Sequence, residues 1–172
     1  MKVISVFAAF VLFGSITAAQ ETKTNEGIHA ACLIMHQSDS DLNHRGEKGM
    51  GFSQTVTTHH FLLKPDGGVI QVEVNESSDA DQLAYVRMHL YHIAAAFQQG
   101  DFDIPMFVHD TIPPGEPEMK ALRNQIRYTL EETKIGGRVV IASTNKNAVA
   151  AIHQFLIFQI QEHKTGDPLQ VP

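Results

Sequence analysis

Histidine is the residue type in this sequence whose number and spacing suggest chemistry, because ten of the 172 residues are histidine. Neutral imidazole is the commonest protein ligand for transition metals, and a His-x-x-His pair on a helix can chelate an ion with one further donor from a facing element. Methionine thioethers are soft donors that suit copper, and Met88 is one such residue. The leading candidate ligands all lie between residues 59 and 109, and they are His59, His60, His89, His92, His109 and Met106.

The first two candidates open a predicted β-hairpin over residues 57–74. Two runs rich in β-branched and apolar residues flank the sequence Pro-Asp-Gly-Gly at residues 65–68, which is typical of a tight reversal. Because side chains alternate across a strand, His59 shares a face with Phe61, whereas His60 points to the opposite face. One of the two histidines therefore enters the core side of the hairpin or a pocket beside it.

The next candidates lie on a predicted helix that ends at Gly100. His89 and His92 are one turn apart, on a face beside an apolar stripe that includes Leu90. Residues 101–115 follow as a long connection that contains too many prolines for a helix, and it carries Met106 and His109. If the helix packs on the hairpin, these segments become neighbours. The residues of the apolar stripe are Leu83, Val86, Leu90, Ile93, Ala94 and Phe97.

The rest of the chain repeats this pattern. A helix is predicted over residues 116–125, a second hairpin over residues 126–142 with a Gly-Gly turn, and a final helix over residues 145–163. The final helix is apolar nearly all round, so either the domain or a second subunit must cover it on more than one side. A homodimer through this C-terminal helix is one of these two arrangements. Its histidines, His153 and His163, are interpreted as structural.

The two halves form a weak internal repeat of hairpin, helix and Gly-Asp ending. The Gly-Gly turns lie 69 residues apart and the Gly-Asp endings 66 residues apart. Duplication and convergence on the same pattern explain this equally well. Two ββα units would pair their hairpins into a four-stranded antiparallel sheet with helices on one face, which is an α+β fold.

The amino-terminal segment predicts export. Lys2 precedes a short apolar run and then small residues up to Ala19, which is typical of a signal peptide over residues 1–19. No later run of about 20 apolar residues predicts a membrane span, so we expect a periplasmic or secreted protein without stable membrane insertion. Residues 20–51 predict a polar, loosely ordered arm, and residues 52–172 a single domain. The arm contains a short apolar patch, Cys32-Leu33-Ile34-Met35-His36, for which soft-metal binding is the less favoured interpretation.

Charge and cysteine content exclude two classes of protein. The formal net charge is −6 and no cluster of basic residues is visible, so nucleic acid is not an expected partner. Cys32 is the single cysteine, which excludes an intrachain disulfide framework. The fold must therefore depend on its hydrophobic core.

Several short motifs are shared with a known family. They are Met50-Gly51-Phe52, Thr57 to Phe61, Asp66-Gly67-Gly68, Pro105-Met106 with His109, Pro113-Pro114-Gly115, Gly136-Gly137-Arg138-Val139 and residues 158–167. With them, nearly all of the chain beyond the arm resembles a family of uncharacterised exported bacterial proteins. Some members carry an aspartate carbamoyltransferase label, but this sequence lacks the Ser-x-Arg-Thr-Arg signature of that enzyme and is about half the size its two domains need. The resemblance implies a periplasmic setting and no particular activity.

These observations favour a periplasmic protein that binds a transition metal, copper or zinc, through histidines of the first hairpin and helix. The alternative is a non-enzymatic binding or assembly domain in which the histidines are structural. A third hypothesis, a small hydrolase-like enzyme, depends on His109-Asp110 as a base and its orienting carboxylate. No Gly-x-Ser-x-Gly motif or reactive-cysteine context accompanies that pair.

Overall fold

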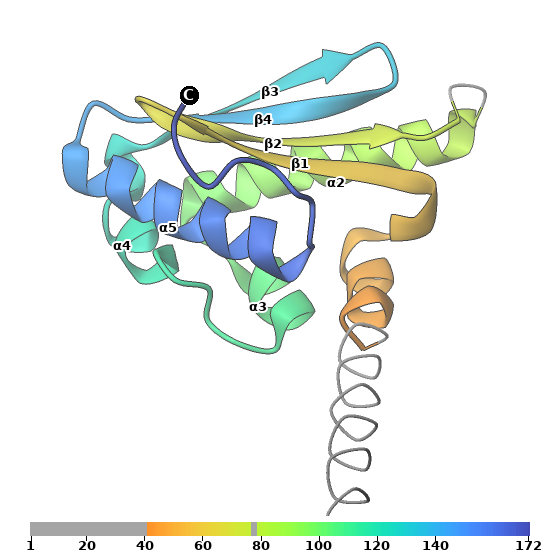
Figure 1. Cartoon of the computed structure of the whole chain (residues 1–172), viewed down its shortest axis with the longest axis horizontal. Helices are drawn as coiled ribbons and strands as arrows, with labels where there is room; N and C mark the ends of the chain where they lie inside the picture. The colour runs from red at the N-terminus through yellow and green to blue at the C-terminus, as the bar shows by residue number, and fades with distance from the viewer. Residues whose placement is uncertain (1–40, 77–78) are drawn as a thin grey trace, which may run out of the picture. The chain divides into compact units, whose positions relative to one another are not determined.

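The computed structural model describes residues 41–76 and 79–172. The predicted signal peptide, the patch at residues 32–36 and the rest of the arm up to residue 40 lie outside the described residues. Within the two described ranges, the chain folds into one sheet and a layer of helices (Figure 1). No helix in these ranges is both long and apolar enough to cross a membrane.

The sheet is four-stranded and antiparallel, with the strand order β1-β2-β4-β3. Each hairpin contributes one inner and one outer strand, so Ile70 of the first hairpin pairs with both Phe61 and Val139. The predicted joining of two hairpins into one sheet is confirmed. The strands are β1 (Thr57–Lys64), β2 (Gly67–Val74), β3 (Arg127–Thr133) and β4 (Gly136–Ala142).

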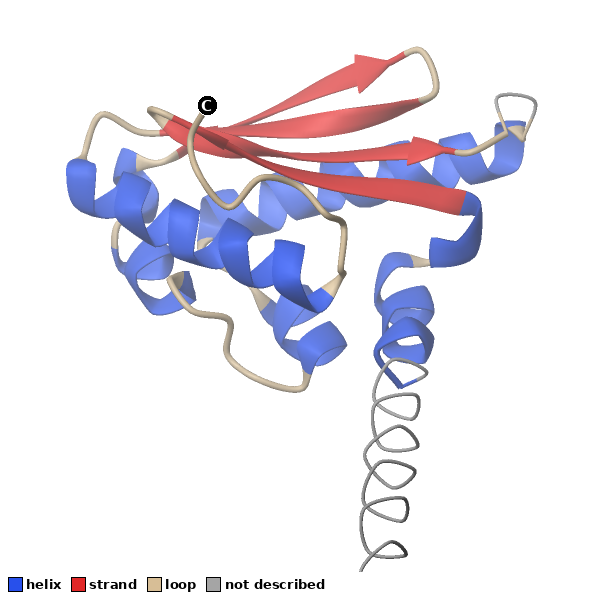
Figure 2. Cartoon of the chain, viewed as in Figure 1, coloured by secondary structure: helices blue, strands red, loops and turns tan. Residues whose placement is uncertain are grey.

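Two long helices, α2 (Ala80–Gln99) and α5 (Lys146–Glu162), lie on the same face of the sheet (Figure 2). The Asp79 side chain caps α2 by accepting a hydrogen bond from the Gln82 N–H, and left-handed Gly100 ends it. Asn145 caps α5 in the same way. The α+β class is therefore confirmed.

Each long helix packs mainly on the hairpin of the other ββα unit. Helix α2 contacts β3 and β4 more extensively than β2, and α5 contacts β1 and β2. Glycines in the hairpins allow this close approach: Leu90 of α2 lies over Gly137, where an added Cβ would be 3.0 Å from its Cδ1, and Leu156 of α5 lies over Gly68. The two units are consequently interlocked and share one core.

The connection after α2 differs from the prediction, because it contains the helix α3 (Asp103–His109). Pro105 is the third residue of this helix, within the first turn, where the missing N–H has no intrahelical partner to lose. The prediction of no helix in this segment was therefore wrong. The following helix, α4 (Glu116–Ala121), is shorter than predicted and continues into the 3-10 helix η2 (Arg123–Gln125).

Residues 41–50, which the sequence analysis assigned to the arm, form a helix that packs on the domain. Arg45 Nε donates a hydrogen bond to the carbonyl oxygen of Val108 in α3 at 2.9 Å. Beyond this helix, the 3-10 helix η1 (Gln54–Val56) leads into β1, and the Phe52 side chain is buried in the core. This part of the chain closes one end of the helical layer.

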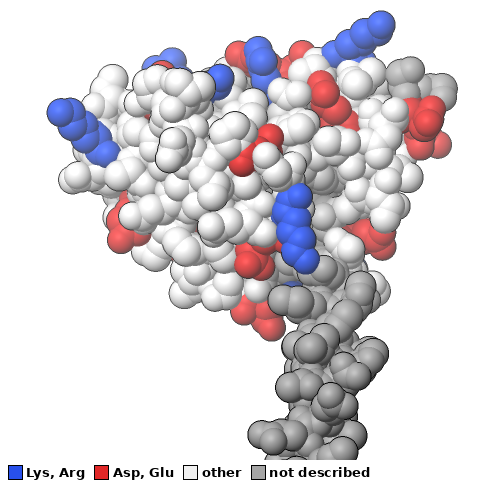
Figure 3. All heavy atoms as spheres, in the orientation of Figure 1, with Lys and Arg blue, Asp and Glu red and all other residues white. Residues whose placement is uncertain are grey.

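The apolar surface of α5 is covered within the domain, by β1, β2 and α4. Its Phe155 and Leu156 are fully buried, and no residue of α5 is among the exposed large hydrophobic side chains of the described residues. On the face drawn in Figure 3, acidic and basic side chains are scattered singly over a mostly uncharged surface. The homodimer through α5 remains a prediction.

Candidate functional site: a buried histidine pocket

Four histidines from four different elements line one cavity of about 60 Å³. They are His59 on β1, His89 on α2, His109 at the end of α3 and His163 at the C-cap of α5. We call this cavity the histidine pocket. Its other lining residues are Met50, Phe61, Ile70, Val72, Leu90, Ile93, Ile104, Pro105, Val108, Phe155 and Gln159.

The local structure explains why these rings point inward. His59 and Phe61 are two residues apart and therefore share the helix-facing side of β1. His89 precedes the buried Leu90 of α2. His109 is the last residue of α3, after which Asp110 adopts a left-handed conformation with φ of 52°. Each imidazole is thus held at or near the core by an element that the sheet packing positions.

The imidazole rings contact one another and an aromatic neighbour. The rings of His59 and His163 are nearly parallel, 8° apart, with centroids separated by 5.8 Å. The His109 ring meets His163 edge to face, with centroids 5.0 Å apart. Phe52 packs edge to face on His89 at 5.4 Å and stacks on His59 at 6.0 Å. The rings therefore form one contiguous aromatic cluster.

Burial keeps these imidazoles uncharged at neutral pH. It lowers the pKa of His59 and of His89 to about 4, and that of His163 to about 3, with neighbouring imidazoles as the second cause in each case. Burial also lowers the pKa of His109, against the opposing effect of its hydrogen bond with Gln159. All four rings therefore present one lone pair and one N–H near pH 7.

Only part of this hydrogen-bonding capacity is used. His109 Nε2 donates to Gln159 Oε1 at 2.9 Å, which leaves Nδ1 as the lone-pair nitrogen, and His163 Nδ1 donates to Gln54 Oε1 at 3.3 Å. Among the described residues, three buried polar atoms that line the pocket have no hydrogen-bond partner: His59 Nε2, His109 Nδ1 and Gln159 Nε2. Such atoms are costly to bury, by about 1–3 kcal/mol each, unless something else binds them.

No protein-family model, curated protein or solved structure matches this sequence. The site must therefore be interpreted from its own geometry. Within residues 41–76 and 79–172, no group of three or more His, Cys, Asp or Glu side chains already stands in a metal-binding arrangement. An ion that binds three imidazoles here would therefore need the rings to rotate.

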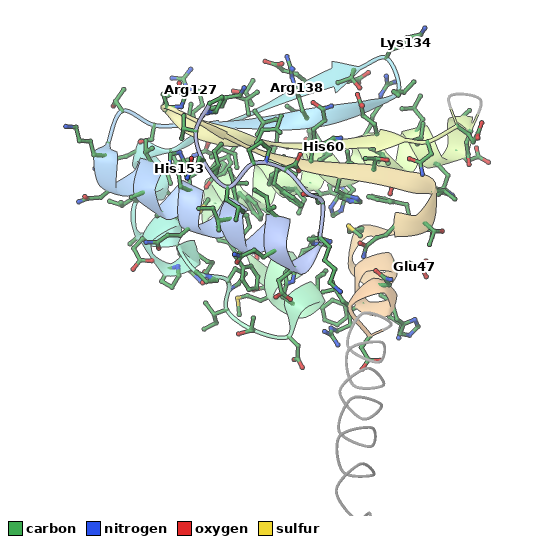
Figure 4. All side chains as sticks on the ribbon, viewed as in Figure 1. Glu47, His60, Arg127, Lys134, Arg138 and His153 are labelled. Atoms are coloured by element: carbon green, nitrogen blue, oxygen red, sulfur yellow. The ribbon has the colours of Figure 1, made fainter. Side chains whose placement is uncertain are left out.

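Three of the six predicted ligands line the pocket, namely His59, His89 and His109. The other three do not. His92 is exposed on α2, and Met106 is half-buried on α3 and is not a lining residue. His60 lies on the opposite face of the sheet (Figure 4), as the strand alternation predicts.

His60 has a structural partner instead. Its Nδ1 donates to Asp167 Oδ1 at 2.9 Å, and the Phe61 N–H donates to the other carboxylate oxygen at 2.9 Å. Burial acts to raise the pKa of Asp167, but hydrogen bonds from Thr165, Phe61 and His60 outweigh it and hold this pKa below its ordinary value. The contact ties the segment after α5 to the edge strand β1.

Sequence reasoning missed three residues of the pocket: His163, Met50 and Gln159. His163 was interpreted as structural because a cation near the end of a helix favours the helix dipole. The packing of α5 on β1 brings it beside His59. His153 does fit the structural interpretation, since its Nε2 donates to the Lys64 carbonyl at 2.8 Å. It precedes His163 by ten residues, which is about 15 Å along the helix axis.

The His109-Asp110 pair does not form a dyad in the structure. The His109 ring is buried against Gln159 and Phe158, whereas Asp110 is exposed. The closest carboxylate to the ring is Glu162, with Oε2 3.9 Å from Nδ1. The arrangement favours binding through neutral nitrogen atoms over proton transfer by an Asp-oriented base.

Proposed function

We propose that this protein binds a transition-metal ion and that its binding site is the histidine pocket. The observation that carries the proposal is the convergence of four neutral imidazoles on one small cavity, with His59 Nε2 and His109 Nδ1 buried and without a partner in the described chain. Lone pairs buried in this way cost folding free energy. A metal ion would bind them and recover that cost.

The proposed ligands are imidazoles of His59, His89 and His163, with His109 beside them. The hydrogen bond from His109 Nε2 to Gln159 selects the tautomer that leaves Nδ1 available, which is the role such partners have around metal-bound histidines. Since the rings are neutral without a metal, binding requires no deprotonation above about pH 5.

Calorimetric titration of the untagged protein with Cu(I), Cu(II) and Zn(II) tests this proposal. The double variant His59→Gln with His89→Gln is expected to weaken binding by about 100-fold, because it removes two donors from the cavity. The matched control, His92→Gln with His153→Gln, removes two histidines outside the pocket and should leave the affinity unchanged. Equal losses in both variants, or tight binding by neither the variants nor the native protein, would contradict the proposal.

A small uncharged molecule is the second candidate ligand. Gln159 Nε2 is a buried donor that lines the same pocket without a partner in the described chain, and a metal ion cannot accept a hydrogen bond. The cavity is otherwise lined mainly by apolar side chains, which is typical of sites for small organic ligands. This candidate corresponds to a non-enzymatic binding domain, and native binding of none of the three ions would favour it.

We further propose that the protein is exported to the bacterial periplasm or secreted. The leader over residues 1–19 and the resemblance to exported bacterial proteins support this proposal. The intact mass of protein recovered from an exporting host is expected to lack residues 1–19. A mass that retains Met1 would remove the export assignment.

A further inference from the structure

The histidine pocket contains no charged side chain. None of its lining residues is Asp, Glu, Lys or Arg, and burial keeps its imidazoles neutral near pH 7. The nearest carboxylate, Glu162, is 46% exposed and reaches only to 3.9 Å from His109 Nδ1. Arg45, which hydrogen-bonds Val108 O, acts in the opposite direction to Glu162 on the pKa of His109. An ion that enters the pocket therefore meets neutral lining donors, with the Glu162 carboxylate outside the lining.

A neutral, largely apolar site discriminates between ions by their charge. The free energy of moving an ion from water into a medium of low dielectric constant rises with the square of the charge. For ions of equal size, this transfer free energy is about four times larger for a dication than for a monocation. Divalent sites commonly offset this cost with carboxylates, thiolates or bound water. The pocket has no carboxylate or thiolate among its lining residues.

The pocket also contains a soft donor. Met50, half-buried at the end of the helix over residues 41–50, lines the same cavity as the four imidazoles. Thioether sulfur prefers Cu(I) to harder ions, whereas imidazole accepts several metals. Met106 and Met88, which the sequence suggests as soft donors, do not line the cavity. A sulfur donor also reduces the number of imidazoles that must rotate into position.

We propose that the histidine pocket selects monovalent copper, Cu(I), and that Met50 is a thioether ligand beside imidazoles of His59, His89 and His163. This inference rests on the proposed function and deepens it, because it identifies the ion and its oxidation state. Zn(II) and Cu(II) are disfavoured relative to Cu(I) by their higher charge, because no lining residue of the pocket supplies a carboxylate or thiolate.

Anaerobic competition titration tests the selectivity. The protein is titrated with Cu(I) against a chromophoric Cu(I) chelator and, separately, with Zn(II) against a chromophoric Zn(II) chelator. All samples carry Cys32→Ser and Met35→Leu, so that sulfur from residues 32–36 contributes no binding. Cu(I) is expected to bind more tightly than Zn(II). Met50→Leu should weaken the affinity for Cu(I) by about 10- to 100-fold and leave the affinity for Zn(II) unchanged. The control, Met106→Leu, should change neither affinity.

X-ray absorption at the copper edge provides a readout that does not depend on how well Met50→Leu folds. The protein with Met50 intact should show sulfur bound to copper together with imidazole nitrogen. Nitrogen alone would overturn Met50 as a ligand, and Zn(II) binding as tight as Cu(I) would overturn the selectivity, while the proposed metal-binding function stands in both cases. Binding of no ion at all would overturn both proposals, so the two failures are distinguishable.

Discussion

Acidification from pH 7 to pH 4 is expected to remove most of the stability of this protein. The pKa values of His59, His89 and His163 lie at about 4, 4 and 3 in the folded state, against about 6.5 in the unfolded chain. Above pH 6.5 neither state binds these protons, so the histidines do not affect stability. As the pH falls from 6.5 towards 4, the unfolded chain takes up protons that the folded chain excludes, and unfolding becomes more favourable.

The expected loss of unfolding free energy is large compared with the total stability of a domain. A shift of about 2.5 pKa units corresponds to about 3 kcal/mol for each histidine by pH 4. Three such groups together approach the total stability of an ordinary domain, which is about 5–15 kcal/mol. Urea denaturation followed at pH 7, 6, 5 and 4 is the measurement, with a progressive fall in the free energy of unfolding as the expected result.

A substitution separates this effect from general acid denaturation. His163→Gln removes one of the four imidazoles whose pKa burial lowers, and it should flatten the fall between pH 6.5 and pH 4 by roughly a quarter to a third. Asp167 cannot produce the same effect, because its pKa is below the ordinary value and the stability it contributes is lost only at lower pH. A free energy of unfolding that stays constant from pH 7 to pH 4 would show that the rings are not buried as described.

The sheet and its inner face could be predicted from the sequence because they depend on local rules. The Pro-Asp-Gly-Gly turn and the alternation around Phe61 predicted β1 and β2, and the same alternation predicted that His59 and His60 point to opposite faces of the sheet. Gly100 likewise predicted the end of α2. In each case the prediction depends on residues that are neighbours in the sequence.

The full histidine pocket could not be predicted, because its members meet through packing of distant segments. Each long helix packs on the hairpin of the other unit, where Leu90 lies over Gly137 and Leu156 lies over Gly68. This packing brings His163 beside His59. Met50 reaches the cavity on a helix whose sequence is polar and had been assigned to the arm. His109 was found from its residue type, although the helix that carries it was not.

Truncation of Leu90 is expected to lower the free energy of unfolding by about 2–5 kcal/mol, the usual cost of Leu→Ala in a closed core. Leu90 is 1% exposed, lies over Gly137 and lines the histidine pocket, so its loss would enlarge a cavity that the surrounding sheet and helices cannot close. Urea denaturation of Leu90→Ala measures this loss. An unchanged m-value would show that stability fell without a change in the surface exposed on unfolding.

His92→Ala is the matched control, because it truncates a side chain on the same helix that faces solvent. It should change the free energy of unfolding by no more than about 0.5 kcal/mol. Both residues are in the middle of α2, so fraying of the helix ends contributes little to the comparison. Losses of similar size in the two variants would mean that α2 presents a different face to β3 and β4, and the position of His89 in the pocket would then be incorrect as well.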